Sequence, residues 1–197
     1  MLNTSFSIDI PSEFYSSETH APIDHCIACG RYLLENDIGY FVEKAIKRYP
    51  EYKSDQVIFE YAVCSECHQA MSATYSTEST QAIQNYFAEN TDIMGRFNLM
   101  QEMTESGMFE LKDWLSNCLI KGTPVENLHE YQIACQCIGD RMVVGGAPFL
   151  ISNQAMDEMM MLLSNKTVDQ LNRYMDEFFG LPPELRKLLA DSGVLIF

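Results

Sequence analysis

Basic residues are scarce in this chain. Its 197 residues include 13 lysines and arginines against 28 aspartates and glutamates, which gives a formal net charge of -15. The acidic residues are spread along the whole chain rather than gathered in a tail. An evenly acidic surface repels the phosphate backbone of nucleic acids. The charge therefore disfavours nucleic-acid binding. We expect a protein as the macromolecular partner, and a specific interpretation of the acidic charge is that this partner is basic.

Long apolar runs are also missing. No run approaches the roughly 20 residues that a membrane-spanning helix needs, so we expect no membrane insertion. The segment from Met1 to Pro11 has neither the basic start nor the apolar core of an export signal. Seven cysteines, an odd number, are then typical of a reducing compartment in which thiols are free or metal-bound. We expect a cytoplasmic protein.

Catalytic motifs are absent as well. The chain has no Gly-x-Ser-x-Gly elbow and no His-Glu-x-x-His, and the stretch 145–148 lacks the Lys-Ser/Thr of a phosphate loop. Only four histidines are available as general bases. These absences favour a non-enzymatic protein. An enzyme of unknown reaction, with its site in the helical half, is the competing hypothesis, because catalytic groups need not be adjacent in sequence.

Two Cys-x-x-Cys pairs are the chemistry that is present. The pairs Cys26/Cys29 and Cys64/Cys67 are separated by 34 residues. Each pair can place two sulfurs on one side of an ion, and two pairs supply the four thiolates of a tetrahedral structural zinc. Gly30 follows the first pair, where a tight turn often needs a positive φ. We predict that these four cysteines bind one Zn²⁺ in a closed site with no position for a substrate.

Other interpretations of these cysteines are open. Thiolates bind iron as well as zinc, and spacing alone does not choose between the two metals. Cys64-Ser-Glu-Cys67-His68 is also an attachment motif for covalent haem, which the missing export signal disfavours. Either pair could be a redox dithiol, although one shared ion is the simpler account. A second metal site could be assembled from Cys118, His129, Cys135 and Cys137. It is disfavoured, because Cys-x-Cys cannot form the usual turn around an ion and its two cysteines would lie on one face of a strand as small buried hydrophobic residues.

The surroundings of the two pairs predict a β-hairpin followed by a helix. Residues 57–63 alternate as a strand does, and we favour a preceding strand that reaches about Val42. Good helix formers over 68–75 predict a helix that starts at the second pair. In this order of parts, residues 22–80 resemble the treble-clef and zinc-ribbon group of zinc modules. The resemblance implies the same four cysteine ligands. It implies no nuclease activity, since no histidine lies between Cys29 and Cys64.

The remainder of the chain changes to a helical period. Apolar residues at three- and four-residue spacing predict helices over 77–103, with a break at 90–92, and over 111–119, with Gly122 at its end. Residues 123–126 predict a helical turn, and residues 131–144 a β-hairpin around Gly139-Asp140. Further helices are expected from Ser152 or Asn153, from Thr167 to Gly180, and over 182–189, before an apolar tail at 193–197 that should dock on the body or on a partner.

We therefore predict an α+β protein in three parts. Residues 1–21 form an N-terminal arm, residues 22–80 a small zinc module with a β-hairpin, and residues 81–197 a mainly α-helical part. Whether the last two parts share a core is open at this stage. Nucleic-acid binding would need a basic patch on the hairpin between the two cysteine pairs, for which the sequence offers Lys44, Lys47, Arg48 and Lys53.

Overall fold

The fold is α+β, as predicted. The computed structural model describes residues 6–52 and 54–179, and it is 42% helical and 28% strand. The strands are β1 (Ser7–Asp9), β2 (Gly39–Tyr49), β3 (Ser54–Cys64), β4 (Glu130–Ile138), β5 (Arg141–Val143) and β6 (Phe149–Ser152). The α-helices are α1 (Ser65–Ser72), α2 (Thr77–Asn90), α3 (Ile93–Glu105), α4 (Leu111–Trp114), α5 (Asn153–Met161) and α6 (Asn165–Phe179).

All strands belong to one antiparallel sheet of order β1-β5-β4-β2-β3. β2 pairs with β3 on one side and with β4 on the other, the latter over nine positions from Gly39↔Ile138 to Lys47↔Glu130. The other edge of β4 is shared by two short strands, since β5 pairs with its last residues and β6 with its first. The module hairpin and the predicted 131–144 hairpin are therefore neighbours in a single sheet.

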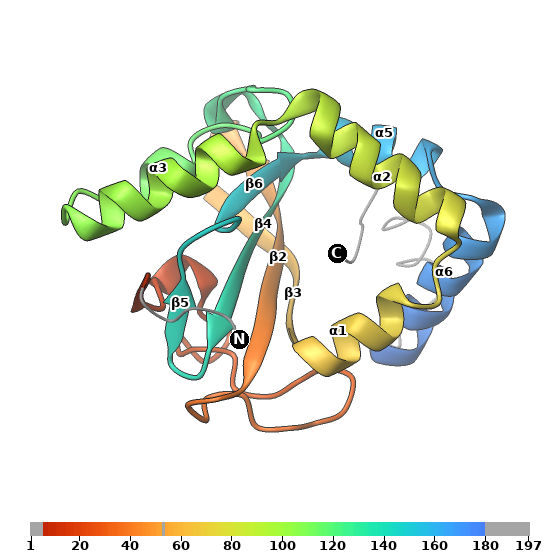
Figure 1. Ribbon diagram of the computed structural model, residues 1–197, viewed down its shortest axis with the longest axis horizontal. Helices are drawn as coiled ribbons and strands as arrows, with labels where there is room; N and C mark the ends of the chain where they lie inside the picture. Colours follow the sequence, from red (N-terminus) through yellow and green to blue (C-terminus); the bar gives the residue numbers. More distant parts are fainter. Residues whose placement is uncertain (1–5, 53, 180–197) are drawn as a thin grey trace.

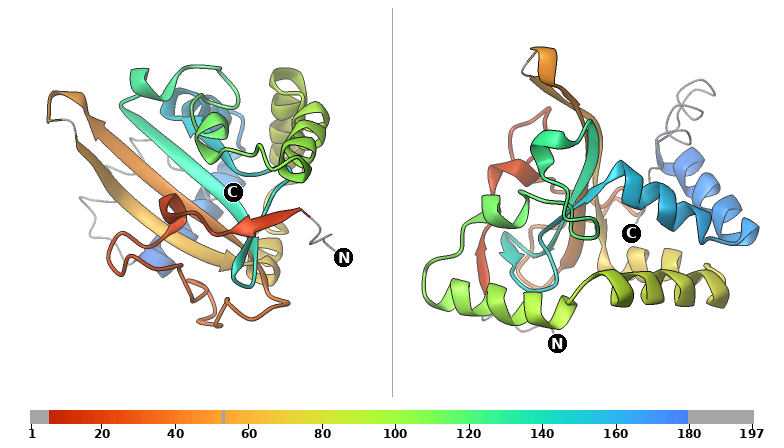
Figure 2. Two further views of the ribbon diagram at one scale, coloured as in Figure 1. Left: turned by 90° about the vertical axis from the view of Figure 1, so that its left-hand side faces the viewer. Right: turned by 90° about the horizontal axis from the view of Figure 1, so that it is seen from above.

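Helices α1, α2, α5 and α6 lie on one side of this sheet. Figures 1 and 2 show α1, α2, α5 and α6 in an arc beside β2 and β3, whereas the N-terminal segment and β1 lie on the opposite side. Helix α3 continues beyond the arc to the far end of the molecule. Within the described residues, none of the helices combines the length and the apolar character needed to cross a membrane.

The predicted zinc module and the remainder of the chain contribute to the same hydrophobic core. Its buried residues include Phe14 from the N-terminal segment, Tyr40 and Val63 from β2 and β3, and Cys137 and Met156 from beyond residue 80. Residue 80 is thus not a boundary of the sheet or of the core. Burial of apolar surface from all three segments stabilises one packed body.

Several predicted elements are confirmed. Helix α1 begins at Ser65, between the two cysteines of the second pair. The 77–103 region is divided into two helices at Thr91 and Asp92. The 131–144 hairpin forms as β4 and β5. The 123–126 turn is a short 3-10 helix over Val125–Asn127. Ser152 caps α5 by accepting a hydrogen bond from the Ala155 N–H.

Strand β2 is longer than predicted. It runs to Tyr49 rather than ending near Val42, although charged residues follow that valine. The two that are buried have partners: Glu43 accepts a hydrogen bond from the Tyr61 hydroxyl, and Lys44 Nζ lies 3.1 Å from Glu60 Oε2. Because these contacts compensate the buried charges, the strand continues with β3 and β4 on either side.

The predicted helix over 111–119 is wrong in its length. Only Leu111–Trp114 is helical, after which Cys118 forms a parallel bridge with Leu150 in β6. The Leu119 N–H donates to the Leu150 carbonyl at 2.7 Å, whereas in a helix it would donate to a carbonyl one turn earlier in the same helix. The apolar spacing predicted the burial of these side chains correctly, since Trp114 and Cys118 are in the core. Gly122, at φ +64, ends a turn instead of a helix.

Some predictions fall outside the described residues. These are the helix over 182–189, the apolar tail 193–197, the helix stop at Gly180, and Lys53 of the hairpin tip.

Candidate metal centre

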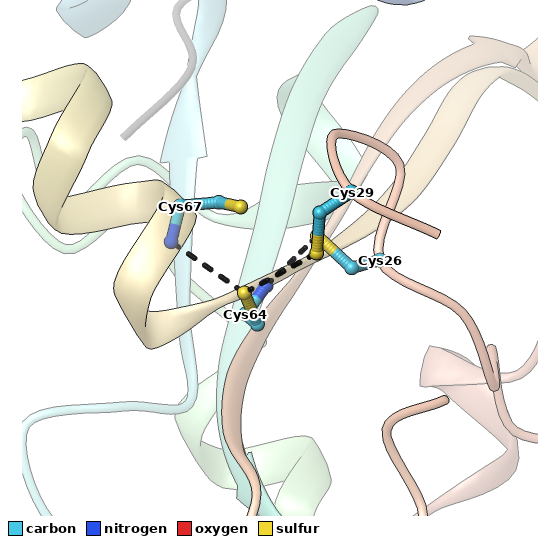
Figure 3. Close-up of side chains that lie close together, drawn as sticks. All are labelled: Cys26, Cys29, Cys64 and Cys67. Atoms are coloured by element: carbon cyan, nitrogen blue, oxygen red, sulfur yellow. Dashed lines mark hydrogen bonds between the residues drawn. The ribbon is translucent and has the colours of Figure 1, made fainter. Parts of the chain in front are cut away.

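The four cysteines of the two pairs lie together at one end of the β2–β3 hairpin (Figure 3). Their sulfur atoms all lie within 4.8 Å of one another, and the Cys29 and Cys64 sulfurs are 3.9 Å apart. Zn–S bonds of about 2.3 Å in a tetrahedron require sulfur separations of roughly 3.8 Å. The four sulfurs are therefore close enough to hold a metal ion such as zinc.

The first pair sits on a tight turn that is fastened to the sheet. The Gly30 N–H donates to the Cys26 carbonyl at 2.8 Å, and Gly30 adopts φ +68, where a residue with a Cβ would be strained. The next contact is with β3, because the Ile27 N–H donates to the Ala62 carbonyl at 2.8 Å. This bond brings Cys26 and Cys29 to the end of the strand that carries Cys64.

Cys64 ends β3, caps α1 and contacts the first cysteine pair. It is the last residue of β3 and the N-cap of α1, with an extended backbone at φ -66 and ψ 153. Its sulfur accepts the Cys67 N–H at 3.5 Å, and its own N–H donates to the Cys26 sulfur at 3.4 Å. Backbone N–H groups and a helix N-terminus favour negative charge on these sulfurs.

The pKa values separate the thiols. Burial acts to raise the pKa of Cys26, but hydrogen bonds from the backbone of Cys64, Cys29 and Ala28 outweigh it and lower that pKa to about 7. Burial raises the pKa values of Cys64 and Cys67. Neighbouring sulfurs add to this rise at Cys67. A divalent cation among the four sulfurs would offset the repulsion between neighbouring thiolates and so favour the deprotonated form of the cysteines.

The centre lies at the surface of the molecule. Cys26 and Cys64 are buried, Cys67 is half-buried and Cys29 is exposed. An ion pair between Arg31 and Glu66, 2.8 Å long, crosses from the first turn to α1. Four sulfur ligands would fill the coordination sphere of a tetrahedral ion, which is typical of structural rather than catalytic zinc. Since all four sulfurs gather, one shared ion is favoured over separate redox pairs or haem attachment.

The second set of candidate ligands is not brought together. Among the residues that the structure describes, the four cysteines above are the one group of three or more ligand side chains close enough for a metal ion. The Cys118 sulfur accepts the Ser152 N–H at 3.2 Å, whereas His129 is exposed. Cys135 and Cys137 are buried with their sulfurs 3.7 Å apart. The three cysteines thus behave as small core residues.

The hairpin does not present a free basic patch in its described part. Lys44 is buried against Glu60, Lys47 Nζ lies 2.7 Å from Glu130, and Arg48 Nε lies 3.2 Å from Asp55. These pairs tie β2 to its neighbours on both sides. The hairpin therefore gives the nucleic-acid hypothesis no support.

Sequence reasoning missed a cavity between the sheet and the helices. It has a volume of about 490 Å³ and a mostly apolar wall. Phe41 and Glu43 of β2 line it, together with His68 of α1, Tyr75, and Thr80 of α2. The signal in the sequence was the alternation of Phe41 with Glu43, which places both side chains on one face of a strand. A volume of this size falls within the range of small-molecule sites.

A buried hydrogen bond forms beside the cavity. Glu43 is 2% exposed, and its carboxylate accepts the Tyr61 hydroxyl. Burial raises the pKa of Tyr61 well above its usual value near 10, and the Glu43 carboxylate raises it further. The phenol therefore stays protonated and keeps donating to Glu43 at neutral pH.

Comparison with protein-family models, curated proteins and solved structures gives no match for this chain.

Proposed function

We propose that this chain is a cytoplasmic zinc protein in which the metal is structural and which acts through contacts with another protein. The grouping of the four sulfurs within 4.8 Å of one another carries the proposal. Cys26, Cys29, Cys64 and Cys67 are its ligands, and zinc is favoured over iron because a structural Cys₄ site is the usual setting of zinc. The ion would connect the first turn, β3 and α1, which carry its four ligands.

The order of the parts supports a treble-clef type of module. A turn with the first pair is followed by the β2–β3 hairpin, and the second pair begins at the junction of β3 and α1. In this arrangement a bound metal would add its binding free energy to the stability of the folded module. Here the module shares its sheet with β4, so the zinc would stabilise the larger body as well.

The charge supports a basic protein as the partner. The chain carries -15 overall, while the described lysines and arginine of the β2–β3 hairpin are already paired with carboxylates. An acidic surface speeds association with a basic protein and slows association with nucleic acid.

Affinity purification of the tagged protein from its own cell tests this function. We expect recovery of a specific protein at low salt that is released at high salt, together with about one zinc ion per chain. A protein that returns alone at low salt, or that contains no stoichiometric zinc, would contradict the proposal.

The cavity favours a second candidate function, binding or conversion of a small apolar molecule. Its wall combines apolar side chains with Glu43, His68 and Tyr75, and perturbed titratable groups beside a pocket are typical of functional sites. Native mass spectrometry of the purified protein should then detect a bound small molecule. Thr80→Trp, an exposed position at the cavity, should abolish it. Equal occupancy in this variant would exclude the cavity as the site.

A further inference from the structure

Three of the large apolar side chains that are exposed to solvent lie on or near α3. Met94 is 67% exposed, Leu99 49% and Met108 61%. Along α3 the exposed side chains Met94, Leu99, Glu102 and Glu105 form a surface that we call the α3 face. Figure 1 shows α3 extending away from the arc of helices, and all four of these side chains are exposed to solvent. Exposed methionines are adaptable binding surfaces, because the side chain is unbranched and polarisable.

A hollow continues the α3 face at the junction with α2. It has a volume of about 560 Å³ and is open to solvent. Ile83, Phe87 and Ala88 of α2 line it, with Ile93 and Met94 of α3. Apolar side chains of two consecutive helices thus form a shallow groove, which is the shape that an amphipathic helix occupies when it binds another protein.

The charge around this groove has one sign. Residues 77–113 contain seven acidic and two basic side chains. Glu89, Asp92, Glu102 and Glu105 are all exposed. The two bases do little to neutralise them. Lys112 Nζ lies 3.9 Å from Glu110.

Arg96 is directed into the molecule. Its guanidinium lies over the Trp114 ring at 4.7 Å and donates to the Pro148 carbonyl at 2.5 Å. Burial lowers its pKa to about 10, so the guanidinium is still charged at neutral pH. This positive charge lies beneath α3 and does not neutralise the acidic side chains on the outer side of the helix. The outer side of α3 is therefore both apolar and acidic.

We propose that the α3 face and the adjoining hollow bind a basic amphipathic helix of a partner protein. This inference rests on the proposed function and names its surface. The apolar side of the incoming helix would cover Met94, Leu99 and the hollow. Its lysines or arginines would lie beside Glu89, Glu102 and Glu105, where opposite charges increase the association rate and select against acidic partners.

A designed peptide tests the surface directly. The probe is a fluorescent peptide of about 18 residues, made of leucine and lysine at helical spacing. Its controls are a scrambled peptide of the same composition and a leucine-glutamate peptide of the same pattern. Anisotropy titrations at about 0.05 M and 0.3 M salt should show binding of the patterned basic peptide that weakens at high salt. Equal affinity for the scrambled peptide would overturn the proposal, because only charge would then be recognised.

Matched variants locate the site. Met94→Glu should weaken binding about tenfold or more, since one buried methionine is worth more than the roughly 1.4 kcal/mol that corresponds to tenfold. Glu102→Lys should weaken it about threefold to tenfold and reduce the salt dependence. Met161→Glu and Glu51→Lys are the controls, because both positions are exposed and lie on α5 and at the β2–β3 tip. Equal losses in the controls would contradict the assignment to α3.

The outcome separates this inference from the function on which it rests. If the partner captured from the cell is retained by Met94→Glu and by Glu102→Lys, the protein-binding function stands and the α3 face is not its surface. If no partner is captured at low salt, the proposed function itself fails, whatever the peptide does.

Discussion

At the scale of single residues, the four clustered cysteines should differ sharply from the other three. Cys26→Ser removes one of four sulfurs, so zinc content should fall from about one per chain to far below it, and the free energy of unfolding should fall by at least several kcal/mol. Elemental mass spectrometry and urea unfolding measure the two quantities. Cys137→Ala is the control: this buried residue lies outside the cluster, so the variant should lose some stability but keep its zinc.

The Tyr61 hydroxyl should make stability depend on alkaline pH. Because the pKa of the folded phenol is raised, its contribution is complete below the unfolded value near 10 and is lost as the pH rises above it. Tyr61→Phe should cost about 1 to 2 kcal/mol at pH 8 through the lost bond to Glu43.

Urea unfolding of the wild type and of Tyr61→Phe from about pH 8 to pH 11 checks this expectation. The variant should lose less stability across the range, and part of the loss should remain because burial raises the pKa of Tyr75 and of Tyr131 as well. Parallel curves for the two proteins would show that Tyr61 does not titrate differently on unfolding.

At the scale of elements, a hydroxyl cluster joins the start of α2 to the start of α6. The Ser76 N–H donates to Thr167 Oγ1 at 3.0 Å, and Ser76 Oγ lies 2.9 Å from Ser164 Oγ. Thr167 is completely buried. Thr167→Val keeps the shape of the side chain but leaves the part-buried Ser76 N–H without this acceptor, so the free energy of unfolding should fall by about 1 to 3 kcal/mol.

Thr91→Val is the matched substitution for this prediction. The Thr91 hydroxyl donates to the Phe87 carbonyl one turn earlier, and that carbonyl also accepts the Thr91 N–H. Its loss should cost less than the loss at Thr167 in the same urea titration. A cost at Thr91 that equals or exceeds the cost at Thr167 would mean that the cluster does not stabilise the contact of α2 with α6.

The elements show which kinds of sequence signal were sufficient. Local signals predicted the β4–β5 hairpin, from Gly139-Asp140, and the start of α5, from its Ser152 cap. Signals that depend on distant partners did not. The segment after Trp114 has helical spacing, but its backbone bonds with Leu150. Likewise β2 continues past Val42 because Tyr61 and Glu60 compensate its buried charges. The cysteine cluster was predictable, since two local pairs carry its chemistry, whereas the cavity joins side chains from segments that lie far apart in the sequence.

At the scale of the whole molecule, one sheet and one core predict a single cooperative unfolding transition. The only tryptophan, Trp114, lies in α4, outside the residues that form the cysteine cluster. Its fluorescence and the far-UV circular dichroism should therefore change at the same urea concentration, and removal of zinc by a chelator should shift both midpoints together. Loss of dichroism that precedes the fluorescence change would instead show that the zinc module and the remainder unfold as separate units.

The pairing of β2 with β4 also has a consequence for synthesis of the chain. After Cys67 has left the ribosome, the cysteine pairs and the β2–β3 hairpin are all available, so zinc can bind before the sheet is complete. The second edge of β2 must wait for β4, which begins at Glu130. At roughly 5 to 20 residues per second, that delay lasts on the order of several seconds. During this time an unpaired strand edge is exposed to other nascent chains, and the growing protein should depend on chaperones that shield it.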